Sequence, residues 1–239
     1  MPARGCTNRC ERALSGIGAS CSTKAVGYGR VGSVTSDEDV DRATSRYPPA
    51  DITPAEFEKF VVELLSSTSG QLDDLAVTLH DKIAGVDGTY DFDATVRFTF
   101  GGVNFLVVVE AKKHKNPIKR ELVQVLRDKT RSVGAQKAVM ISTAPYQRGA
   151  LEYAKTHGIA LATVTEGRFL YETKAVAPAP ALTRDQARER FGLPDFAAHG
   201  YGSADQPGST RMTLLSTEYP DYVAEALLGV ERLVNGGQD

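Results

Sequence analysis

The apolar positions at the start of the patterned region recur at helical spacing, three or four residues apart: Phe57, Phe60, Val61, Leu64 and Leu65. A helix start signal stands directly before them. Thr53 is a good N-cap, Pro54 suits the first helical position, and Glu56 completes a capping box. The pattern predicts an amphipathic helix that ends near residues 66–70.

Two alternating segments on either side of Gly101-Gly102 predict a β-hairpin. One face of the segment 91–100 is apolar, with Phe92, Ala94, Val96, Phe98 and Phe100, and the segment 103–112 has a matching apolar row. A shorter alternation over residues 75–80, before a turn region at 85–88, predicts one strand ahead of the hairpin.

Helical and buried-strand patterns then alternate along the chain. The predicted elements are a helix opened by Pro117 with Ile118, Leu122, Val125 and Leu126 on one side, a strand at 137–142, a helix at 146–157, a strand at 159–164 and a short closing segment at 168–171. The order is α-β-β-β-α-β-α-β, which predicts an α/β fold with a mixed β-sheet flanked by helices.

Composition changes at both ends of this region. Residues 1–48 are rich in Gly, Ser, Thr and Arg without apolar periodicity, so we expect a disordered arm or an overcalled start. We expect one domain over residues 50–172 and, over 173–239, an Ala/Pro linker followed by short helices at 183–191 and 221–228. These helices could form a lid on the core or support a dimer.

The overall composition excludes several classes. The 239 residues carry 28 Lys+Arg and 30 Asp+Glu, a formal net charge of −2, which is typical of one globular domain or two small ones. No apolar run is long enough to span a bilayer, and the N-terminus has no signal-peptide pattern. Three cysteines without a nearby histidine fit neither a disulfide framework nor a zinc site, so we expect a cytoplasmic protein.

The hairpin carries the most informative chemistry. If Gly101-Gly102 is a two-residue turn, the numbers of cross-strand partners sum to 203. That register places Asp93 opposite Glu110 and Asp91 opposite Lys112, with directly opposed Cβ atoms about 4.5–5.5 Å apart. Two carboxylates that share a site repel unless a cation lies between them. A divalent cation such as Mg²⁺ suits that position, and the alternative is a simple cross-strand salt bridge to Lys112.

Positive charge is concentrated beside these carboxylates. Residues 110–137 contain nine Lys/Arg and three acidic residues, a local net charge of +6 that leaves −8 for the rest of the chain. Such a segment is typical of contacts to a nucleic-acid backbone, although a solvated helix face gives the same pattern. The DNA-contacting residues that we expect are Lys113, Lys115, Lys119, Arg120 and Arg127.

Asp93, followed across the hairpin by Val108-Val109-Glu110-Ala111-Lys112, resembles the PD-(D/E)xK nucleases. More specifically, residues 52–172 resemble the Mrr-type restriction endonuclease domain, whose core has the predicted element order. The resemblance implies a restriction-endonuclease-like core. Many domains of this type have Gln where this chain has Glu110, and a carboxylate is the better cation ligand.

The resemblance also implies roles for individual residues. Asp93 and Glu110 would ligate Mg²⁺, or Mn²⁺, with the Ala111 carbonyl as third ligand, and Lys112 would act on the attacking water. Glu58 would assist from the first helix, unless it is only a solvent-facing charge. Gln124 resembles a glutamine that some of these nucleases place beside the metal. Asp91 is the fallback for Asp93 and could instead bridge to Lys112.

The expected function is a Mg²⁺-dependent DNA endonuclease of restriction type, acting in defence against foreign DNA. DNA is the expected partner, together with a second copy of the chain or a separate specificity subunit. Two alternatives remain open: a catalytically silent module that binds DNA or a protein, and a repair or junction-resolving nuclease.

Overall fold

The structure is a computed structural model that describes residues 50–70, 72–167, 182–203 and 210–230. The expected arm at 1–48, the closing segment at 168–171 and the Ala/Pro linker at 175–181 lie outside the described residues. Within the described part of the chain, no helix is both long and apolar enough to cross a membrane.

Helix α2 (Pro54–Ser66) begins at the predicted capping box. Thr53 Oγ1 accepts a hydrogen bond from the Glu56 N–H at 3.2 Å, and the Glu56 carboxylate accepts one from the Thr53 N–H at 2.7 Å. The five apolar positions of the sequence pattern are all buried, and a short 3-10 helix, η1 (Ser67–Gly70), follows. The prediction for this helix is confirmed.

Seven strands form one mixed sheet in the described part of the chain, and their spatial order is their order in the sequence. The strands are β1 (Asp73–Ala84), β2 (Thr89–Phe100), β3 (Val103–Lys112), β4 (Lys137–Ser142), β5 (Ala160–Glu166), β6 (Phe196–Ser203) and β7 (Thr210–Leu215). The central strands β3, β4 and β5 are parallel, and the pairs on either side of them are antiparallel. The predicted mixed α/β fold is confirmed.

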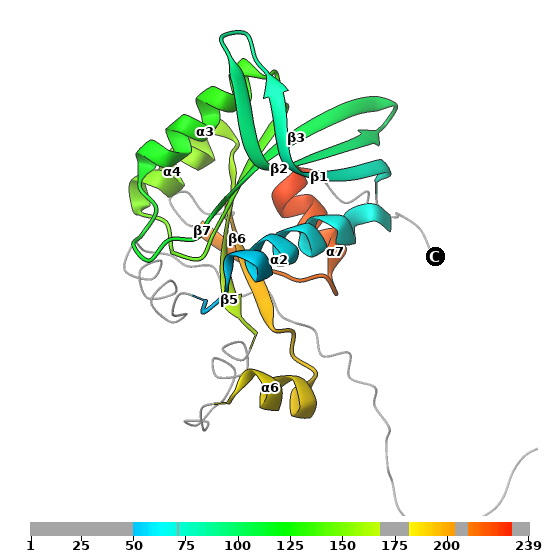
Figure 1. The fold of residues 1–239 in the computed structure, drawn as a ribbon, viewed down its shortest axis with the longest axis vertical. Coiled ribbons are helices and arrows are strands. Elements are labelled where there is room, and N and C mark those ends of the chain that lie inside the picture. Colours follow the sequence, from blue (N-terminus) through cyan, green and yellow to red (C-terminus); the bar gives the residue numbers. More distant parts are fainter. Residues whose placement is uncertain (1–49, 71, 168–181, 204–209, 231–239) are drawn as a thin grey trace, which may run out of the picture.

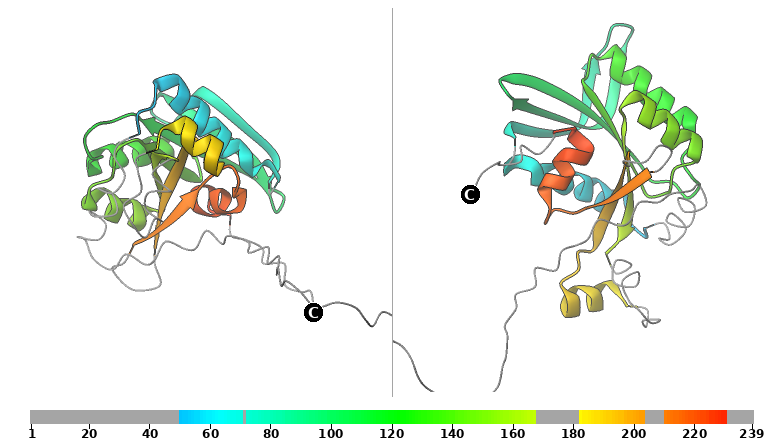
Figure 2. Two further views of the ribbon diagram at one scale, coloured as in Figure 1. Left: turned by 90° about the horizontal axis from the view of Figure 1, so that it is seen from below. Right: turned by 180° about the vertical axis from the view of Figure 1, so that it is seen from behind.

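Helices cover both faces of the sheet (Figure 1; Figure 2, right). Helices α3 (Arg120–Ser132) and α4 (Arg148–His157) connect the parallel strands on one face. Helix α2 lies on the other face with α7 (Pro220–Val223), which continues as the π-helical turn η2 (Ala224–Leu228). Helix α6 (Arg184–Phe191) lies beyond one end of the strands.

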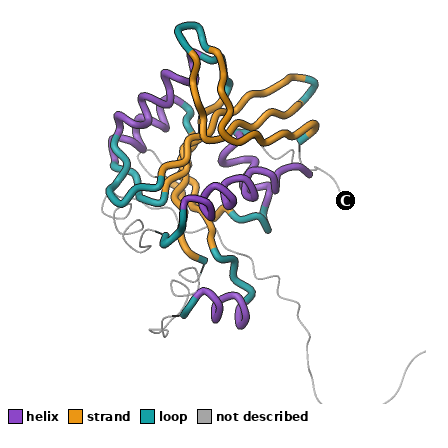
Figure 3. The backbone as a smooth tube through the Cα atoms, in the orientation of Figure 1, coloured by secondary structure: helices purple, strands orange, loops and turns teal. Residues whose placement is uncertain are grey.

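Each face has its own apolar core. The α2 core joins α2 and the C-terminal helical segment to one side of the sheet, and it includes Phe57, Leu64, Ala94, Val96, Val107, Val109, Val223 and Leu227. The α3 core joins α3 and α4 to the other side, and it includes Phe92, Val108, Val123, Leu126, Met140 and Ala150. The hairpins β1–β2 and β2–β3 diverge beyond these cores (Figure 3).

The structure corrects several boundaries. The helix predicted from Pro117 begins only at Arg120, because Ile118 is held in a bridge with Tyr146. Helix α4 begins at Arg148 rather than at 146, and β1 is longer than the alternation at 75–80. The C-terminal region contains the expected short helices, but also β6 and β7, which we did not predict.

Candidate active site

The β2–β3 hairpin has the register that its Gly-Gly turn predicts. Its ladder runs from Phe100 opposite Val103 to Ala94 opposite Val109, so the partner numbers sum to 203 throughout. Gly101 and Gly102 have φ values of +58° and +78°, the two positive angles that a two-residue type I′ turn requires. The two strands therefore carry Asp93 and Glu110 to the same end of the ladder.

At Asp93, the side chains of strand β2 switch from one face of the sheet to the other. Ala94 packs in the α2 core, whereas Phe92 packs in the α3 core. On the neighbouring strand β1, Leu79 pairs with Ala94 and Asp81 pairs with Phe92. His80 lies between these two β1 residues and has a φ of +48°. The prediction that Phe92 and Ala94 share a face is therefore wrong. The left-handed residue at His80 breaks the alternation that a regular strand would keep.

Asp93, Glu110 and Lys112 converge on one point. The Lys112 ammonium lies 2.6 Å from Glu110 Oε2 and 3.7 Å from Asp93 Oδ2. Asp93 Oδ2 also accepts a hydrogen bond of 2.7 Å from the backbone N–H of Ala111. The Lys112 ammonium thus lies between the two carboxylates that the hairpin pattern predicts to meet.

A second lysine completes this group, and the sequence reasoning did not assign it a role in the site. Lys129 of α3 places its ammonium 2.6 Å from Glu110 Oε1 and 5.7 Å from the centre of the Phe92 ring. The only signal in the sequence was its place among the nine basic residues at 110–137. No spacing rule links position 129 to position 110, because the contact depends on how α3 packs on the sheet.

The electrostatics of the group follow from burial and from these hydrogen bonds. Burial raises the pKa of Glu110, but the hydrogen bonds from Lys112 and Lys129 outweigh it and hold the pKa below its ordinary value. Burial likewise lowers the pKa of Lys112, and the hydrogen bond and charge of Glu110 reverse this and raise it. At neutral pH the site therefore holds a carboxylate and a firmly protonated ammonium, which can donate hydrogen bonds but cannot act as a base.

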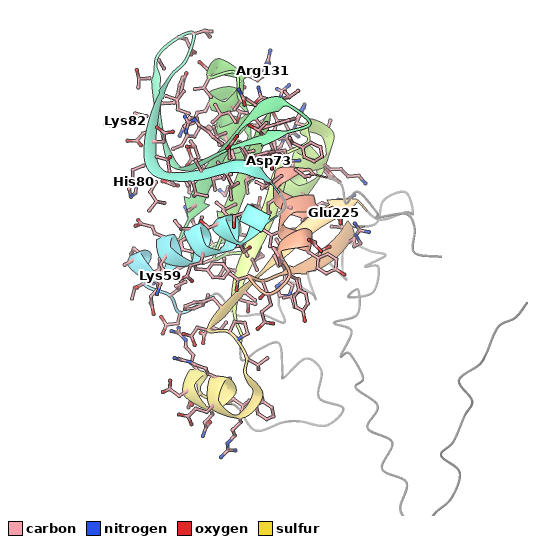
Figure 4. The ribbon with its side chains drawn as sticks, turned by 90° about the vertical axis from the view of Figure 1, so that its right-hand side faces the viewer. Lys59, Asp73, His80, Lys82, Arg131 and Glu225 are labelled. Atoms are coloured by element: carbon pink, nitrogen blue, oxygen red, sulfur yellow. The ribbon has the colours of Figure 1, made fainter. Side chains whose placement is uncertain are left out.

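The remaining acidic positions lie at different distances from this group. Asp91 lies 3.9 Å from Lys82 and is largely exposed, so the structure favours Asp93 as the residue that joins Glu110. Glu58 of α2 lies 3.9 Å from His80, the residue of β1 beside the change of face. Figure 4 shows His80 and Lys82 projecting from β1.

Gln124 lies on a different flank of α3 from Lys129. The two positions are about 140° apart around a regular helix. The Gln124 flank also carries Arg120, whose guanidinium lies 5.0 Å from the centre of the Tyr153 ring, and Arg127, which donates to the Tyr153 hydroxyl at 3.4 Å. This flank faces α4, whereas Lys129 faces Glu110.

The expected DNA-contacting residues divide into two groups. Lys113, Lys115 and Lys119 are exposed on the loop that follows Lys112. Buried Thr143 holds this loop to the end of β4, because its hydroxyl accepts from the His114 N–H and donates to the His114 carbonyl, both at 3.0 Å. Arg120 and Arg127 instead contact Tyr153 of α4.

The donor set suits a hard divalent cation. Among the described residues, no group of three or more His, Cys, Asp or Glu side chains is arranged to hold a metal ion. Mg²⁺ typically takes one or two protein carboxylates and completes its shell with waters and phosphate oxygens, which matches Asp93 and Glu110. Both Glu110 oxygens already contact ammonium groups, so a cation at Glu110 requires one of these groups to move.

The fold and the site define a class: an α/β restriction-endonuclease-like core with an aspartate, a glutamate and a lysine gathered on a central hairpin. Residues 49–166 match the Mrr_cat family model, described as "Restriction endonuclease". The match confirms the resemblance of this part of the chain to that family, which was based on Asp93, Glu110 and Lys112.

Two solved structures are similar to parts of the chain. A protein of unknown function, AF1548, is 16% identical with a TM-score of 0.37, over 44% of this chain and 54% of that one. The DNA modification-dependent restriction endonuclease AspBHI is 20% identical with a TM-score of 0.32, over 51% of this chain and 31% of that one. The matched parts thus span about half and about a third of those proteins. Comparison with curated proteins gives no match.

Proposed function

We propose that the protein is a Mg²⁺-dependent endonuclease that hydrolyses DNA phosphodiester bonds, with Mn²⁺ as a substitute cation. The observation that carries the proposal is the position of the Lys112 ammonium, 2.6 Å from Glu110 and 3.7 Å from Asp93. The match of residues 49–166 to the restriction endonuclease family model supports it.

The chain supplies ligands, a hydrogen-bond donor and positive charge. Asp93 and Glu110, with the Ala111 carbonyl, would hold the cation, which would neutralise charge on the scissile phosphate and acidify a water. Lys112 donates hydrogen bonds to that water or to a phosphate oxygen, and so stabilises the negative charge that develops during in-line attack. Glu58 of α2 would assist directly or through a water.

The exposed lysines on the loop after Lys112 hold the DNA backbone beside the reacting phosphate. Phosphate contacts of this kind position the duplex but do not read its sequence. Target choice and cleavage of both strands therefore call for a second copy of the chain or a separate specificity subunit. In this proposal the protein acts in the cytoplasm against foreign DNA.

A plasmid-nicking assay tests the proposal. The full chain is incubated with supercoiled DNA, with and without Mg²⁺, as wild type and as Asp93→Asn, Lys112→Met and Asp91→Asn. We expect Mg²⁺-dependent nicking that falls by at least about 10²-fold in the first two variants, the usual cost of removing a group that stabilises developing charge. Asp91→Asn is the matched control, because its exposed pair with Lys82 contributes little.

The other outcomes assign the alternatives. Retention of DNA without nicking in any divalent cation contradicts the proposal and indicates a silent binding module. Preferred cleavage of branched over linear DNA indicates a repair or junction-resolving nuclease. Loss of nicking in Asp91→Asn rather than in Asp93→Asn contradicts the assignment of the ligands.

A further inference from the structure

Glu110 is a buried carboxylate with an ammonium group on each oxygen. Its side chain is 5% exposed, and the Lys112 and Lys129 ammonium groups each lie 2.6 Å from one of its oxygens. Together with Asp93, these residues form a group of two negative and two positive charges. The group is thus electrically neutral without any added cation, whereas Asp93, Glu110 and Lys112 alone would be negative.

A divalent cation at Glu110 would meet these ammonium groups directly. A Mg²⁺ ion lies about 2.1 Å from its oxygen ligands. At that distance from either Glu110 oxygen, the cation approaches an ammonium that occupies the same oxygen, and the Glu110 side chain is only 5% exposed, so little water screens it. Cation binding therefore requires one lysine to leave.

The contacts indicate which lysine leaves. Lys112 lies within salt-bridge distance of both Glu110 and Asp93 and comes from the same strand as Glu110. Lys129 pairs with Glu110 and comes from the last turn of α3, an element separate from both strands of the hairpin. Its ammonium also lies 5.7 Å from the centre of the Phe92 ring. Rotation of its long side chain toward solvent frees Glu110 Oε1 without disturbing either strand.

We propose that Lys129 is an internal counter-cation that occupies Glu110 in the metal-free protein and competes with the divalent cation for this carboxylate. The inference rests on the proposed function, because it takes Asp93 and Glu110 as the cation site. The apparent cation affinity is then the intrinsic affinity multiplied by the fraction of molecules from which Lys129 has withdrawn. Lys129 thereby sets the cation concentration at which the site fills.

Mn²⁺ binding to the full chain without DNA tests this role, with free Mn²⁺ measured by electron paramagnetic resonance. Lys129→Met keeps the apolar stem of the side chain, and Lys129→Gln keeps a hydrogen-bond donor for Glu110, while both remove the charge. We expect both variants to bind Mn²⁺ at least about tenfold more tightly than wild type, since a like charge in direct contact disfavours the cation. Lys129→Arg keeps the charge and binds as wild type does.

Arg131→Met is the matched control. It removes one positive charge from the same turn of α3 at an exposed position, two residues from Lys129 (Figure 4). We expect its Mn²⁺ affinity to stay within about twofold of wild type, because exposed charges are screened over a Debye length. Equal tightening in Arg131→Met and Lys129→Met contradicts a specific role for Lys129, and so does unchanged or weaker Mn²⁺ binding in both neutral Lys129 variants.

Thermal unfolding gives a second readout. A cation that binds only the folded state stabilises it by RT ln(1 + [L]/Kd), so a tighter site gains more at the same concentration. A fixed Mn²⁺ concentration therefore raises the Tm of Lys129→Met more than that of wild type. Failure of the inference is distinct from failure of the proposed function. Plasmid cleavage with unchanged Mn²⁺ affinity in the Lys129 variants overturns only the inference. If Glu110→Gln leaves Mn²⁺ binding intact, the cation site itself is overturned.

Discussion

The Asp93 carboxylate accepts a hydrogen bond from the backbone N–H of Ala111, with 2.7 Å between Oδ2 and N. This bond joins the side chain of one strand to the main chain of its neighbour, at the point where β2 changes face. It fixes the position of the carboxylate independently of any cation. The residue therefore has a structural role that can be separated from its proposed chemical role.

Two substitutions of Asp93 separate these roles. Asp93→Asn keeps an oxygen that can accept from the Ala111 N–H, whereas Asp93→Ala leaves this part-buried donor without its partner. We expect Asp93→Ala to be less stable than Asp93→Asn by about 1–2 kcal/mol, while neither variant cleaves DNA. Urea unfolding and the nicking assay measure the two effects. Equal stability of the two variants contradicts the structural role.

Glu110→Gln should lower stability at neutral pH by about 2–3 kcal/mol, because it leaves two ammonium groups without their shared anion. The lysine hydrogen bonds hold the pKa of Glu110 below its ordinary value of 4.5, so this stabilisation is present above that value and disappears as the pH falls through the depressed pKa. Tm values of both proteins between pH 7 and pH 3 measure the effect.

The difference in Tm between wild type and Glu110→Gln should therefore narrow in acid. Glu63→Gln is the control, since its exposed pair with Lys59 contributes little at any pH. A difference that stays constant down to pH 3 would contradict the ion-pair role of Glu110.

His199 should make stability depend on pH in a different window. Burial lowers the pKa of this β6 residue to about 4, from an ordinary value of 6.5. The unfolded chain therefore binds more protons between these values, and stability falls as the pH decreases, by up to about 1.4 kcal/mol per pH unit. Urea unfolding at pH 7, 6 and 5 should show this slope in wild type. His199→Gln should lack it, and an equal slope in both would exclude His199 as the source.

Lys113 and Lys115 should contribute to DNA affinity through phosphate contacts. We expect the double variant Lys113→Gln/Lys115→Gln to bind duplex DNA more weakly and to lower the slope of log K against log[salt] by about 2. The comparison is Arg211→Gln on β7, four strands across the sheet from β3. A salt titration of binding measures both slopes, and an unchanged slope in the double variant would place the DNA elsewhere.

The β2–β3 hairpin shows which part of the site is determined by the local sequence. Two adjacent glycines allow the positive φ angles of a tight turn, and that turn sets every pairing up to Ala94 and Val109. The capping box at Thr53 is equally local. These features need only contacts between residues close in the chain, so the sequence predicts them. Asp93 and Glu110 lie just beyond the paired residues, and both contact Lys112.

The features of the fold and of the site that the sequence did not predict depend on contacts between residues that are distant in the chain. Lys129 reaches Glu110 because of how α3 lies on the sheet. The change of face at Asp93 lies beside His80 of the neighbouring strand, whose φ is positive. Strand β6 has small residues and two glycines where a strand pattern would have branched apolar ones. It forms because β5 and β7 pair with it on either side.

The two C-terminal strands determine how far the domain that contains the matched residues can be shortened. The family match ends at residue 166, but β6 pairs with β5 beyond that point, and Val223 and Leu227 fill the same core as α2. A polypeptide truncated at residue 172 would leave β5 as an open edge and uncover apolar side chains beneath α2. Open edges of this kind pair with other chains, so the truncated protein would aggregate rather than fold as an independent catalytic fragment.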